Sequence, residues 1–320
     1  MKRTRLLAAV LAFILCLASA AAPAAAEEGK KLNIVTTIFP LYDWVLQAAG
    51  VTGRAEITLL VDSGVDLHSY QPTAADMMKI ASCDVFVYVG GESDKWVEDA
   101  LKGSANPDQM VISLLDALGE DVKTEELVEG MEQDPDEKDE DQEADEHVWL
   151  SLRNARKLTA AIAGRLAEAD PDYAEAYAAG AAAYDARLAE LDARYAEVIG
   201  AAARSTILFC DRFPFRYLAD DYGLVYYAAF AGCSAETEAS FRTIVFLAEK
   251  INELDLPAVL TIEGASHKIA ETVIRTTGKK NQKILALDSM QSVTAAEIQA
   301  GASYLSIMEE NLEVLREALN

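Results

Sequence analysis

The sequence predicts an α/β protein made of two similar α/β lobes that are joined by a long, rigid helix. Short β-rich runs alternate with helical stretches on both sides of the middle of the chain, which is typical of βα units with parallel sheets. An alanine-rich stretch, residues 154–203, separates the two series. The 320 residues are enough for two domains of ordinary size. The alternative is a long helix packed within one large domain.

The first residues have the pattern of an export signal. Met1–Arg5 is basic, Leu6–Leu17 is apolar but short for a membrane span, and Ala24–Ala26 is a small-residue cleavage site. We therefore expect a signal peptide over residues 1–26 and an extracytoplasmic protein, in the periplasm or at the cell surface. A lipid anchor at Cys16 is an alternative, although no small residue precedes this cysteine as a lipoprotein signal requires.

The N-terminal lobe is expected over residues 27–153. Apolar, β-branched runs predict its strands, and amphipathic stretches after turn residues predict its helices. In order, the segments are a strand at Lys31–Thr37, a helix at Phe39–Ala49, a strand at Glu56–Val61, a helix at Thr73–Ala81, a strand at Asp84–Val89, a helix at Trp96–Leu101 and a strand at Gln109–Leu114.

An acidic block, residues 131–146, interrupts this lobe near its end. Its carboxylates repel one another, so composition predicts a solvated, mobile surface loop. A second interpretation is a weak cation collector at the mouth of a site, because carboxylates bind hard and borderline cations weakly.

Residues 154–203 predict two linking helices, with a break at Asp170-Pro171. Proline at the first helical position after an aspartate N-cap is a start signal, and Gly200 is a plausible stop. Tyrosines and apolar residues recur at helical spacing after the break. At about 1.5 Å per residue this second helix would be on the order of 45 Å long, enough to join two lobes.

The C-terminal lobe is expected over residues 204–320, where the α/β pattern resumes. No sequence repeat relates it to the first lobe. In order, the segments are a strand at Ser205–Phe209, a helix at Phe213–Tyr222, a strand at Leu224–Phe230, a helix at Ser240–Leu254, a strand at Ala258–Ile262, a helix at His267–Thr277, a strand at Lys283–Leu287 and a helix at Tyr304–Leu319.

Charge and cysteine content narrow the possible partners. The 28 basic and 53 acidic residues give a net charge of −25, which argues against nucleic acid or an anionic membrane as partner. Besides Cys16, the chain has Cys83, Cys210 and Cys233. In an exported protein three cysteines allow at most one intramolecular disulfide.

Residues able to bind a metal stand where expected strands end and loops begin, the usual place for ligand groups in open α/β sheets. His68 lies in the loop after the second strand, His147 closes the acidic block, Cys210 and Asp211 follow the strand at Ser205–Phe209, and Asp288 follows Lys283–Leu287. Their spacing matches no local metal motif. Spacing alone therefore supports a four-ligand site only weakly.

Longer segments around these residues resemble the zinc/manganese-type solute-binding proteins of ABC importers. The segments are TTIFPLYDW (Thr36–Trp44), Val65–Gly91, DEHVWLSLRNA (Asp145–Ala155), FCDRFPFRYLADDYGL (Phe209–Leu224) and LALDS (Leu285–Ser289). The resemblance covers essentially the whole mature chain. It implies a periplasmic-binding-protein-like fold of the helical-backbone type, with one metal ion in the cleft between the lobes.

The resemblance also implies a ligand set. The family's histidines fall on His68 and His147, its carboxylate falls on Asp288, and Cys210 stands where histidine or glutamate is usual. A thiolate, two imidazoles and a carboxylate suit Zn²⁺ in a tetrahedron, whereas Mn²⁺ prefers oxygen ligands. We expect Zn²⁺, with Mn²⁺ as the alternative.

Several alternatives to this ligand set stay open. Asp211 could be the ligand in place of Cys210, or Cys210 could instead form a disulfide with Cys233. Glu263 could lie behind the ligands or be the fourth ligand in place of Asp288. Cys233, in a Gly-Cys-Ser loop, is a weaker ligand candidate, and His267 is expected to be a surface or capping residue.

The expected function is capture of a divalent transition metal, zinc in first place, by the extracytoplasmic substrate-binding component of an ABC importer. The expected partners are the metal ion and a membrane permease, with no nucleic acid, and the chain is expected to be a monomer. A manganese-specific protein of the same type and a metal-dependent surface adhesin are alternatives. A metallohydrolase is disfavoured because the sequence holds no HExxH or serine elbow, so we expect no enzyme.

Overall fold

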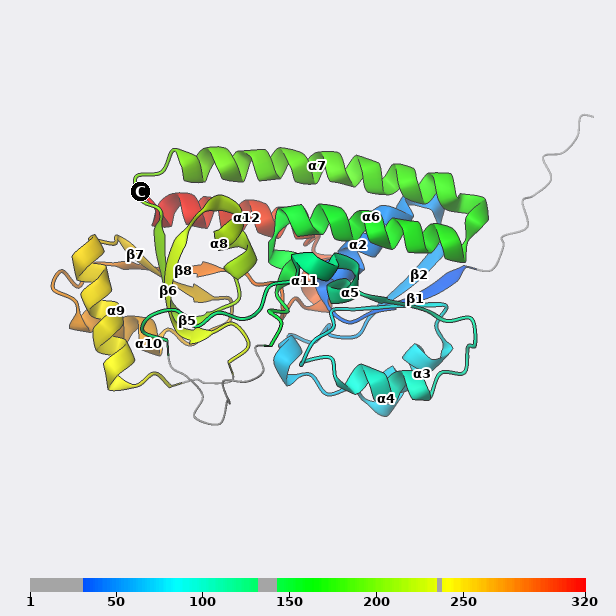
Figure 1. Ribbon diagram of the computed structural model, residues 1–320, viewed down its shortest axis with the longest axis horizontal. Helices are drawn as coiled ribbons and strands as arrows, with labels where there is room; N and C mark the ends of the chain where they lie inside the picture. Colours follow the sequence, from blue (N-terminus) through cyan, green and yellow to red (C-terminus); the bar gives the residue numbers. More distant parts are fainter. Residues whose placement is uncertain (1–30, 132–142, 235–237) are drawn as a thin grey trace, which may run out of the picture. The chain divides into compact units, whose positions relative to one another are not determined.

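A computed structural model describes residues 31–131, 143–234 and 238–320, and Leu32–Asn320 forms one compact unit (Figure 1). The expected signal peptide, Cys16 and residues 132–142 of the acidic block lie outside the described residues. None of the described helices combines the length and apolar character needed to cross a bilayer.

The first half contains a four-stranded, fully parallel sheet with the strand order β2-β1-β3-β4. Its elements are β1 (Leu32–Thr36), α2 (Phe39–Ala49), β2 (Ala55–Leu59), α3 (Ala74–Ser82), β3 (Val85–Tyr88), α4 (Trp96–Lys102), β4 (Met110–Ser113) and α5 (Leu114–Leu118), with 3-10 turns at Gly50–Thr52, Leu67–Ser69, Gly119–Asp121 and Val148–Leu150. The helix α5 was not expected from the sequence. Each loop that follows a strand emerges at the same edge of the sheet, because the strands are parallel.

The second half repeats this arrangement. Its sheet has the order β6-β5-β7-β8 and is also parallel, so both sheets follow the same topology although their sequences show no repeat. Its elements are β5 (Thr206–Phe213), α8 (Arg216–Tyr222), β6 (Val225–Ala231), α9 (Phe241–Leu254), β7 (Ala258–Ile262), α10 (Lys268–Thr276), β8 (Lys283–Leu287), α11 (Ala295–Gln299) and α12 (Tyr304–Ala318). The predicted class, two α/β lobes with a long helix, is confirmed.

Two long helices, α6 (Leu152–Ala169) and α7 (Ala174–Gly200), connect the halves. They pack against each other, and α7 also contacts α2, α8 and α12 (Figure 1). The 27 residues of α7 correspond to about 40 Å. The predicted break is present, but Pro171 begins a short 3-10 turn rather than α7 itself.

The aspartate at this break has another role than the predicted helix cap. The Asp170 side chain makes no capping bond. Instead Asp170 Oδ2 accepts hydrogen bonds from Arg54 Nε (3.1 Å) and Tyr177 OH (2.9 Å). The start of α7 is therefore tied to the loop before β2.

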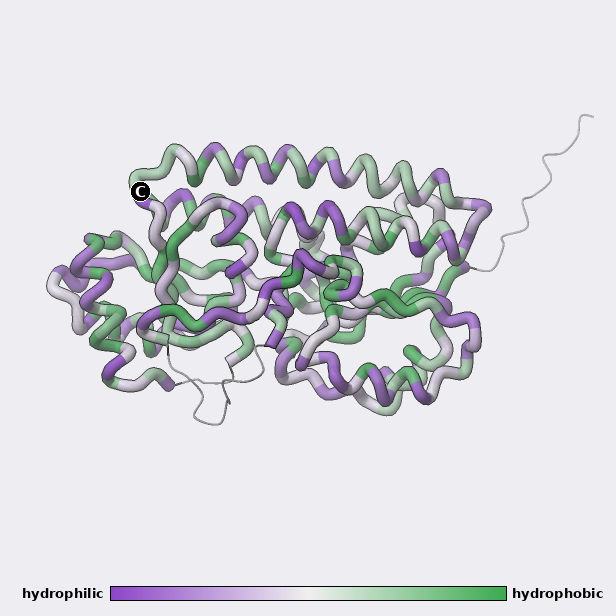
Figure 2. Tube along the Cα trace, in the orientation of Figure 1, coloured by the Kyte–Doolittle hydropathy of each residue, from purple (hydrophilic) through white to green (hydrophobic). Residues whose placement is uncertain are grey.

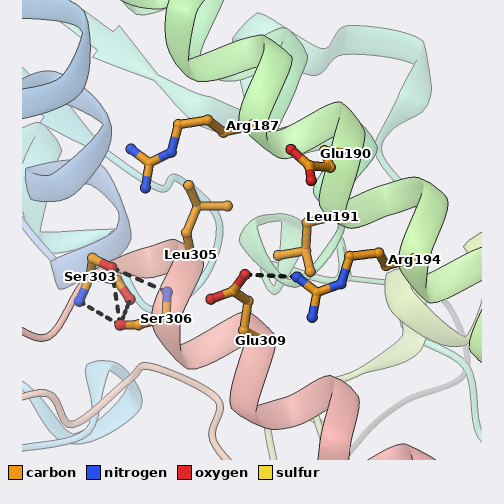
Figure 3. A pocket seen from close by; sticks show the side chains of 8 residues that line it. All are labelled: Arg187, Glu190, Leu191, Arg194, Ser303, Leu305, Ser306 and Glu309. Atoms are coloured by element: carbon orange, nitrogen blue, oxygen red, sulfur yellow. Dashed lines mark hydrogen bonds and ion pairs between the residues drawn. The ribbon is translucent and has the colours of Figure 1, made fainter.

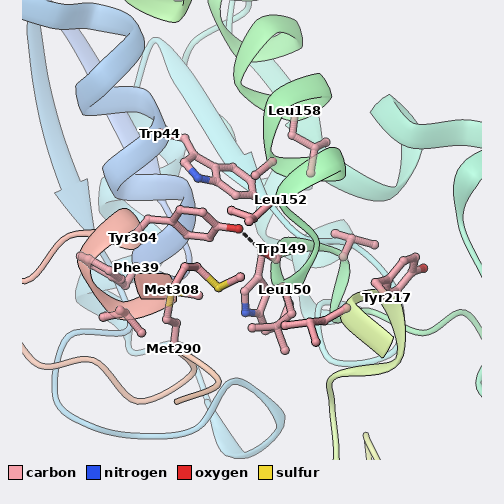
Figure 4. Packing of buried hydrophobic residues seen from close by; sticks show 14 of the residues in the cluster. Phe39, Trp44, Trp149, Leu150, Leu152, Leu158, Tyr217, Met290, Tyr304 and Met308 are labelled. Carbon is pink, nitrogen blue, oxygen red and sulfur yellow. Dashed lines mark hydrogen bonds between the residues drawn. The ribbon is translucent and has the colours of Figure 1, made fainter. Parts of the chain in front are cut away.

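One apolar cluster runs through both halves, with members from both sheets and from α2, α6, α7 and α12. Figure 2 shows the alternation of hydrophobic and hydrophilic residues along α6 and α7 that this packing requires. Near its centre Tyr304 OH donates to the carbonyl oxygen of Trp149 (2.7 Å), and the Tyr304 ring meets Trp44 edge to face (Figure 4). The boundaries drawn from the sequence at residues 153 and 203 stay a prediction.

Candidate metal centre

Three side chains from distant parts of the chain converge on one point. Among the residues that the structure describes, His68, His147 and Cys233 form a group whose ligand atoms all lie within 4.8 Å of one another. His68 lies in the 3-10 turn after β2, His147 directly precedes the turn Val148–Leu150, and Cys233 follows β6. The Nε2 atoms of the two histidines are 3.1 Å apart.

The turn that carries His68 is held by Asp66. Asp66 Oδ1 accepts the backbone N–H of His68 (2.9 Å), and Asp66 Oδ2 forms an ion pair with Arg212 of β5. Nδ1 of the ring lies 2.7 Å from Ser93 Oγ, so this nitrogen already has a partner. Burial, and after it the neighbouring His147, lowers the pKa of His68 to about 3. The ring is therefore neutral near pH 7, as a metal ligand must be.

His147 is fully buried and its orientation is fixed from two sides. Asp145 Oδ1 lies 2.9 Å from His147 Nδ1 and also accepts the backbone N–H of His147 (3.0 Å). The carbonyl oxygen of Asp145 accepts a hydrogen bond from Tyr217 OH (3.0 Å). A carboxylate on Nδ1 fixes the proton there and leaves the Nε2 lone pair toward His68.

Cys233 completes the group as a half-buried thiol. Its backbone N–H donates to Glu125 Oε1 (2.8 Å), and the backbone of Glu146 hydrogen-bonds the sulfur. Burial, followed by the negative charge of Glu125, raises the pKa of the Cys233 thiol. A cation at this point would favour the thiolate strongly, since thiolate is the form that binds metal.

The donor set and its spacing fit zinc. Two nitrogens bound to Zn²⁺ at about 2.0–2.1 Å in a tetrahedron are about 3.3 Å apart, close to the observed separation of 3.1 Å. When both Nδ1 atoms carry protons, two lone pairs face each other across this distance. A shared proton or a metal ion resolves that repulsion.

Cys210 does not belong to this group. It was expected as a ligand because the sequence predicts that its strand ends at Phe209, and this predicted end is wrong. β5 does not end at Phe209 but continues to Phe213. Successive strand residues face opposite sides, so Phe209 joins the main core whereas Cys210 lies in a second apolar cluster beside α9 and α10. Cys210 is 2% exposed, and burial raises the pKa of its thiol.

Cys83, Cys210 and Cys233 are all free, so the disulfide alternative between Cys210 and Cys233 is wrong for the described cysteines. The sequence contains a signal for Cys233, because Gly232-Cys233 directly follows β6 at the loop edge of the second sheet.

The carboxylates of the second half form a separate group at the ends of β7 and β8. Asp288 Oδ1 accepts the backbone N–H of Met290 (2.7 Å), and Glu263 accepts hydrogen bonds from the amide and hydroxyl of Ser289 (both 2.7 Å). Burial, followed by the charge of Asp288, raises the pKa of Glu263 to about 7. Neither carboxylate belongs to the His68–His147–Cys233 group.

Asp211 and His267 lie elsewhere in the second half. Asp211 accepts the amides of Arg212 (2.9 Å) and Ile262 (3.4 Å). His267 is exposed, as expected, at the N-cap position of α10 without a capping bond from its side chain.

Two acidic residues of the block 131–146 are not on the surface as composition predicted. Asp145 is 2% exposed and Glu146 is fully buried. Glu146 Oε1 accepts the backbone N–H of Ser93 (2.8 Å), next to the ring of His68. Neither Ser93 nor Glu146 was identified from the sequence as part of the site.

A separate cavity of about 240 Å³ lies between α7 and α12 (Figure 3). Arg194 pairs with Glu309 (2.8 Å), and Ser303 and Ser306 cap the start of α12 through reciprocal hydrogen bonds. Its lining residues include neither histidine nor cysteine, so this cavity is not the metal centre.

Comparison with known proteins identifies the family of the chain. The family described as zinc-uptake complex component A, periplasmic, matches residues 34–318. The zinc-binding lipoprotein AdcA of Streptococcus pneumoniae is 33% identical over 292 residues, which cover 90% of this chain and 56% of AdcA. The high-affinity zinc uptake system protein ZnuA of Bacillus subtilis is 28% identical over 298 residues, 92% of this chain and 89% of ZnuA. The chain thus spans about half the length of the AdcA relatives.

Solved structures show the same fold. The Zn(II)-bound ZnuA-like domain of Streptococcus pneumoniae AdcA superposes with a TM-score of 0.70 at 32% identity, covering 90% of this chain and 99% of that domain. The metal-dependent lipoprotein YcdH from Bacillus subtilis gives a TM-score of 0.73 at 28% identity, covering 90% and 99%. With a family match over most of its length, the chain belongs to the periplasmic zinc-uptake component A family.

Proposed function

We propose that this protein captures a zinc ion outside the cytoplasm through His68, His147 and Cys233 and delivers it to the permease of an ABC importer. One observation carries the proposal: the two Nε2 atoms face each other at 3.1 Å while both Nδ1 atoms are already engaged, and a thiol lies within 4.8 Å. The zinc-binding relatives support the identity of the ion.

Binding would proceed by exchange of protons for metal. The His68 imidazole is neutral near pH 7, and Cys233 gives up its thiol proton when the ion arrives. Acid would weaken binding because protons compete for the same three donor atoms. The protein acts here as a binding component and supplies no reaction of its own.

A fourth ligand would come from the second half of the chain. Asp288, expected from the sequence, and Glu263 are the two carboxylates that end neighbouring strands there. Cys210 is not part of the proposed set because its side chain lies in the apolar cluster beside α9. Export by a signal peptide over residues 1–26 and a monomeric state belong to the same proposal.

Zinc is proposed over manganese because of the sulfur. Thiolate and imidazole are the donors that Zn²⁺ prefers, whereas Mn²⁺ is bound mainly by oxygen. A manganese protein would need the carboxylates of Asp288 and Glu263 to dominate the site.

The test is a titration of the reduced protein with Co²⁺, a spectroscopic substitute for zinc, followed by absorption. Two variants form a matched pair: Cys233→Ser removes the proposed ligand, and Cys210→Ser removes a buried thiol from the neighbouring apolar cluster. We expect a tetrahedral spectrum with a sulfur-to-cobalt charge-transfer band in the unsubstituted protein. The band should vanish in Cys233→Ser and persist in Cys210→Ser.

Loss of the band in Cys210→Ser alone would instead restore the ligand set expected from the sequence. An octahedral spectrum that neither variant changes would remove sulfur from the site and favour manganese. Asp288→Asn and Glu263→Gln, titrated in the same way, identify the fourth ligand by which of them alters the tetrahedral bands.

A further inference from the structure

We infer that Glu146 is a positioning residue that holds the His68 imidazole with its Nε2 lone pair toward the metal, an inference that rests on the zinc-binding function proposed above. The Glu146 side chain is fully buried. Its Oε1 accepts the Ser93 amide at 2.8 Å. Its Oε2 is also buried, has no hydrogen-bond partner among the described residues and lies 3.9 Å from His68 Nδ1.

Such an unpartnered carboxylate oxygen needs an explanation, because a buried acceptor without a donor costs stability. The candidate donors around this carboxylate are the Ser93 hydroxyl, the backbone N–H of Glu92 and the imidazole of His68. Its Nδ1 is 2.7 Å from Ser93 Oγ, so ring, hydroxyl and carboxylate stand together at one side of the ring. We infer that the carboxylate accepts the Nδ1 proton directly, after a small shift of the ring or of the carboxylate.

The surrounding loop is built to admit this carboxylate. A Cβ on Gly91 would lie only 2.5 Å from Glu146 Oε1, and Gly91 has a positive φ of +83°, so glycine is required there for space and for conformation. Asp94 Oδ2 accepts the amides of Val89 (2.9 Å) and Gly90 (3.0 Å) and fixes the turn that presents Ser93. Residues 89–94 therefore form the loop against which the Glu146 side chain packs.

An acceptor at Nδ1 decides which imidazole nitrogen is free for the metal. A proton held on Nδ1 leaves the lone pair on Nε2, the atom that faces His147 Nε2. A carboxylate behind a ligating histidine also raises the basicity of the ring, and loss of such a partner typically costs about 10–100-fold in metal affinity. Glu146 would thus do for His68 what Asp145 does for His147.

Glu146 also touches the other two ligands through its backbone. Its backbone hydrogen-bonds the Cys233 sulfur, and its peptide bond leads directly into His147. The side-chain role can be separated from this backbone role by substitutions that leave the main chain in place.

The experiment compares Glu146→Gln with Glu92→Gln. Glutamine keeps the length of the side chain, its packing against Gly91 and an acceptor for the Ser93 amide, but it places an NH₂ donor near Nδ1. Glu92 is an exposed carboxylate of the same loop, paired with Lys95, so Glu92→Gln removes one negative charge nearby without touching the ring.

Two readouts are used, ¹⁵N NMR of the histidine rings in zinc-free protein and zinc affinity by competition with a chelator. In Glu146→Gln we expect the His68 proton to move to Nε2, where it would donate to His147 Nε2, while His147 keeps its own proton on Nδ1. Zinc affinity should fall about 10–100-fold. Glu92→Gln should change neither. Unchanged His68 signals together with unchanged affinity in Glu146→Gln would overturn the inference.

Ser93→Ala provides a second test that keeps the carboxylate should Glu146→Gln fail to fold. If Glu146 positions the ring, His68 keeps its Nδ1 proton in Ser93→Ala because Oε2 accepts it. A His68 proton that moves to Nε2 in this variant would assign the role to Ser93 and overturn the inference. Zinc that shifts neither histidine in the unsubstituted protein would refute the proposed function, while the zinc-free spectra would still decide the role of Glu146.

Discussion

At the scale of single residues, Asp94 combines a structural role with an unusual proton affinity. It is 2% exposed, and its Oδ1 has no hydrogen-bond partner among the described residues. Burial is the main cause that raises the pKa of Asp94 to about 7, and the charge of Glu146 adds to it, against two backbone amides that lower it. Between the ordinary value of 3.8 and about 7, the folded protein holds a proton that the unfolded chain has released.

This difference makes a prediction about pH. A carboxyl whose pKa is raised by folding stabilises the folded state less as pH rises, because the unfolded state then binds fewer protons than the folded one. Ionisation of Asp94 should lower the free energy of unfolding by at most about 4 kcal/mol as pH rises from 4 to 8. Asp94→Asn cannot ionise, so its free energy of unfolding should rise relative to the unsubstituted protein over this window. Urea unfolding of the zinc-free protein at several pH values measures it.

The free energies of unfolding of the two proteins must be subtracted at each pH, because His68 makes the folded state more stable as pH rises whereas Asp94 makes it less stable. Folding lowers the pKa of His68 from 6.5 to about 3. As pH falls below 6.5, the unfolded chain therefore binds a proton at His68 that the folded protein does not, and the free energy of unfolding decreases. That contribution is common to both proteins and cancels in the difference. A difference that is flat from pH 4 to pH 8 would contradict the assignment to Asp94.

At the scale of elements, the contact between α7 and α2 depends on one small residue. A Cβ on Gly180 of α7 would lie 2.6 Å from the carbonyl oxygen of Ala48 and 2.8 Å from that of Gln47, both in α2. Gly180 has no positive φ, so the backbone itself would accept alanine. The absence of a side chain at Gly180 therefore allows α7 and α2 to pack closely.

Gly180→Ala should therefore destabilise the protein by about 1–3 kcal/mol, because backbone atoms cannot move aside as a flexible side chain would. Gly164 of α6 is the matched control, since it is exposed and a Cβ there meets nothing within 4 Å. Gly164→Ala should stabilise by about 0.4–1 kcal/mol through helix propensity. Chemical denaturation measures both. Equal effects of the two substitutions would refute the packing explanation.

At the scale of the whole molecule, the largest apolar cluster is shared by the two sheets and the long helices, in addition to a smaller cluster within each half. Hydrogen bonds add to this link, as Trp149 Nε1 donates to the carbonyl oxygen of Ser289 (2.8 Å). Asp66 and Arg212 form an ion pair between the loop of His68 and β5. A wide opening of the halves would expose part of this core to water, which is unfavourable.

We therefore expect only a small change of conformation on metal binding. Small-angle X-ray scattering of the protein with and without zinc should give the same radius of gyration within experimental error. A large compaction on zinc addition would show that the halves separate widely in the metal-free state, and would refute the shared core as a constraint on motion.

Most of the fold could be predicted from the sequence because its signals are local. Helices and strands are indicated by apolar runs, amphipathic stretches and breaks such as Asp170-Pro171, which depend only on residues close in sequence. For β7 and β8 the predicted limits are the observed ones. The end of β5 was predicted four residues too early, since its continuation depends on pairing with β6. That error placed Cys210 in a loop when it faces the apolar cluster beside α9.

The candidate site could be predicted only in part. The two histidines were identified, but Cys233 joins them only through the arrangement of the two halves, which no local pattern contains. Asp145 and Glu146 belong to a run of like charges that composition assigns to solvent. Contacts with His147, Tyr217 and Ser93 place them in the interior. Whether Asp288 binds metal stays a prediction.

The packing of Gly232 against His147 has a genetic consequence. A Cβ on this glycine would lie 3.0 Å from Cε1 and 3.2 Å from Nδ1 of the imidazole. Unlike Gly91, Gly232 has no positive φ, so its backbone would tolerate other residues. Every missense change of this codon therefore adds an atom against the ring of His147, a proposed ligand. The same Cβ would also lie 3.0 Å from the carbonyl oxygen of Phe213 in β5, so we expect such changes to be selected against through both folding and the proposed metal binding.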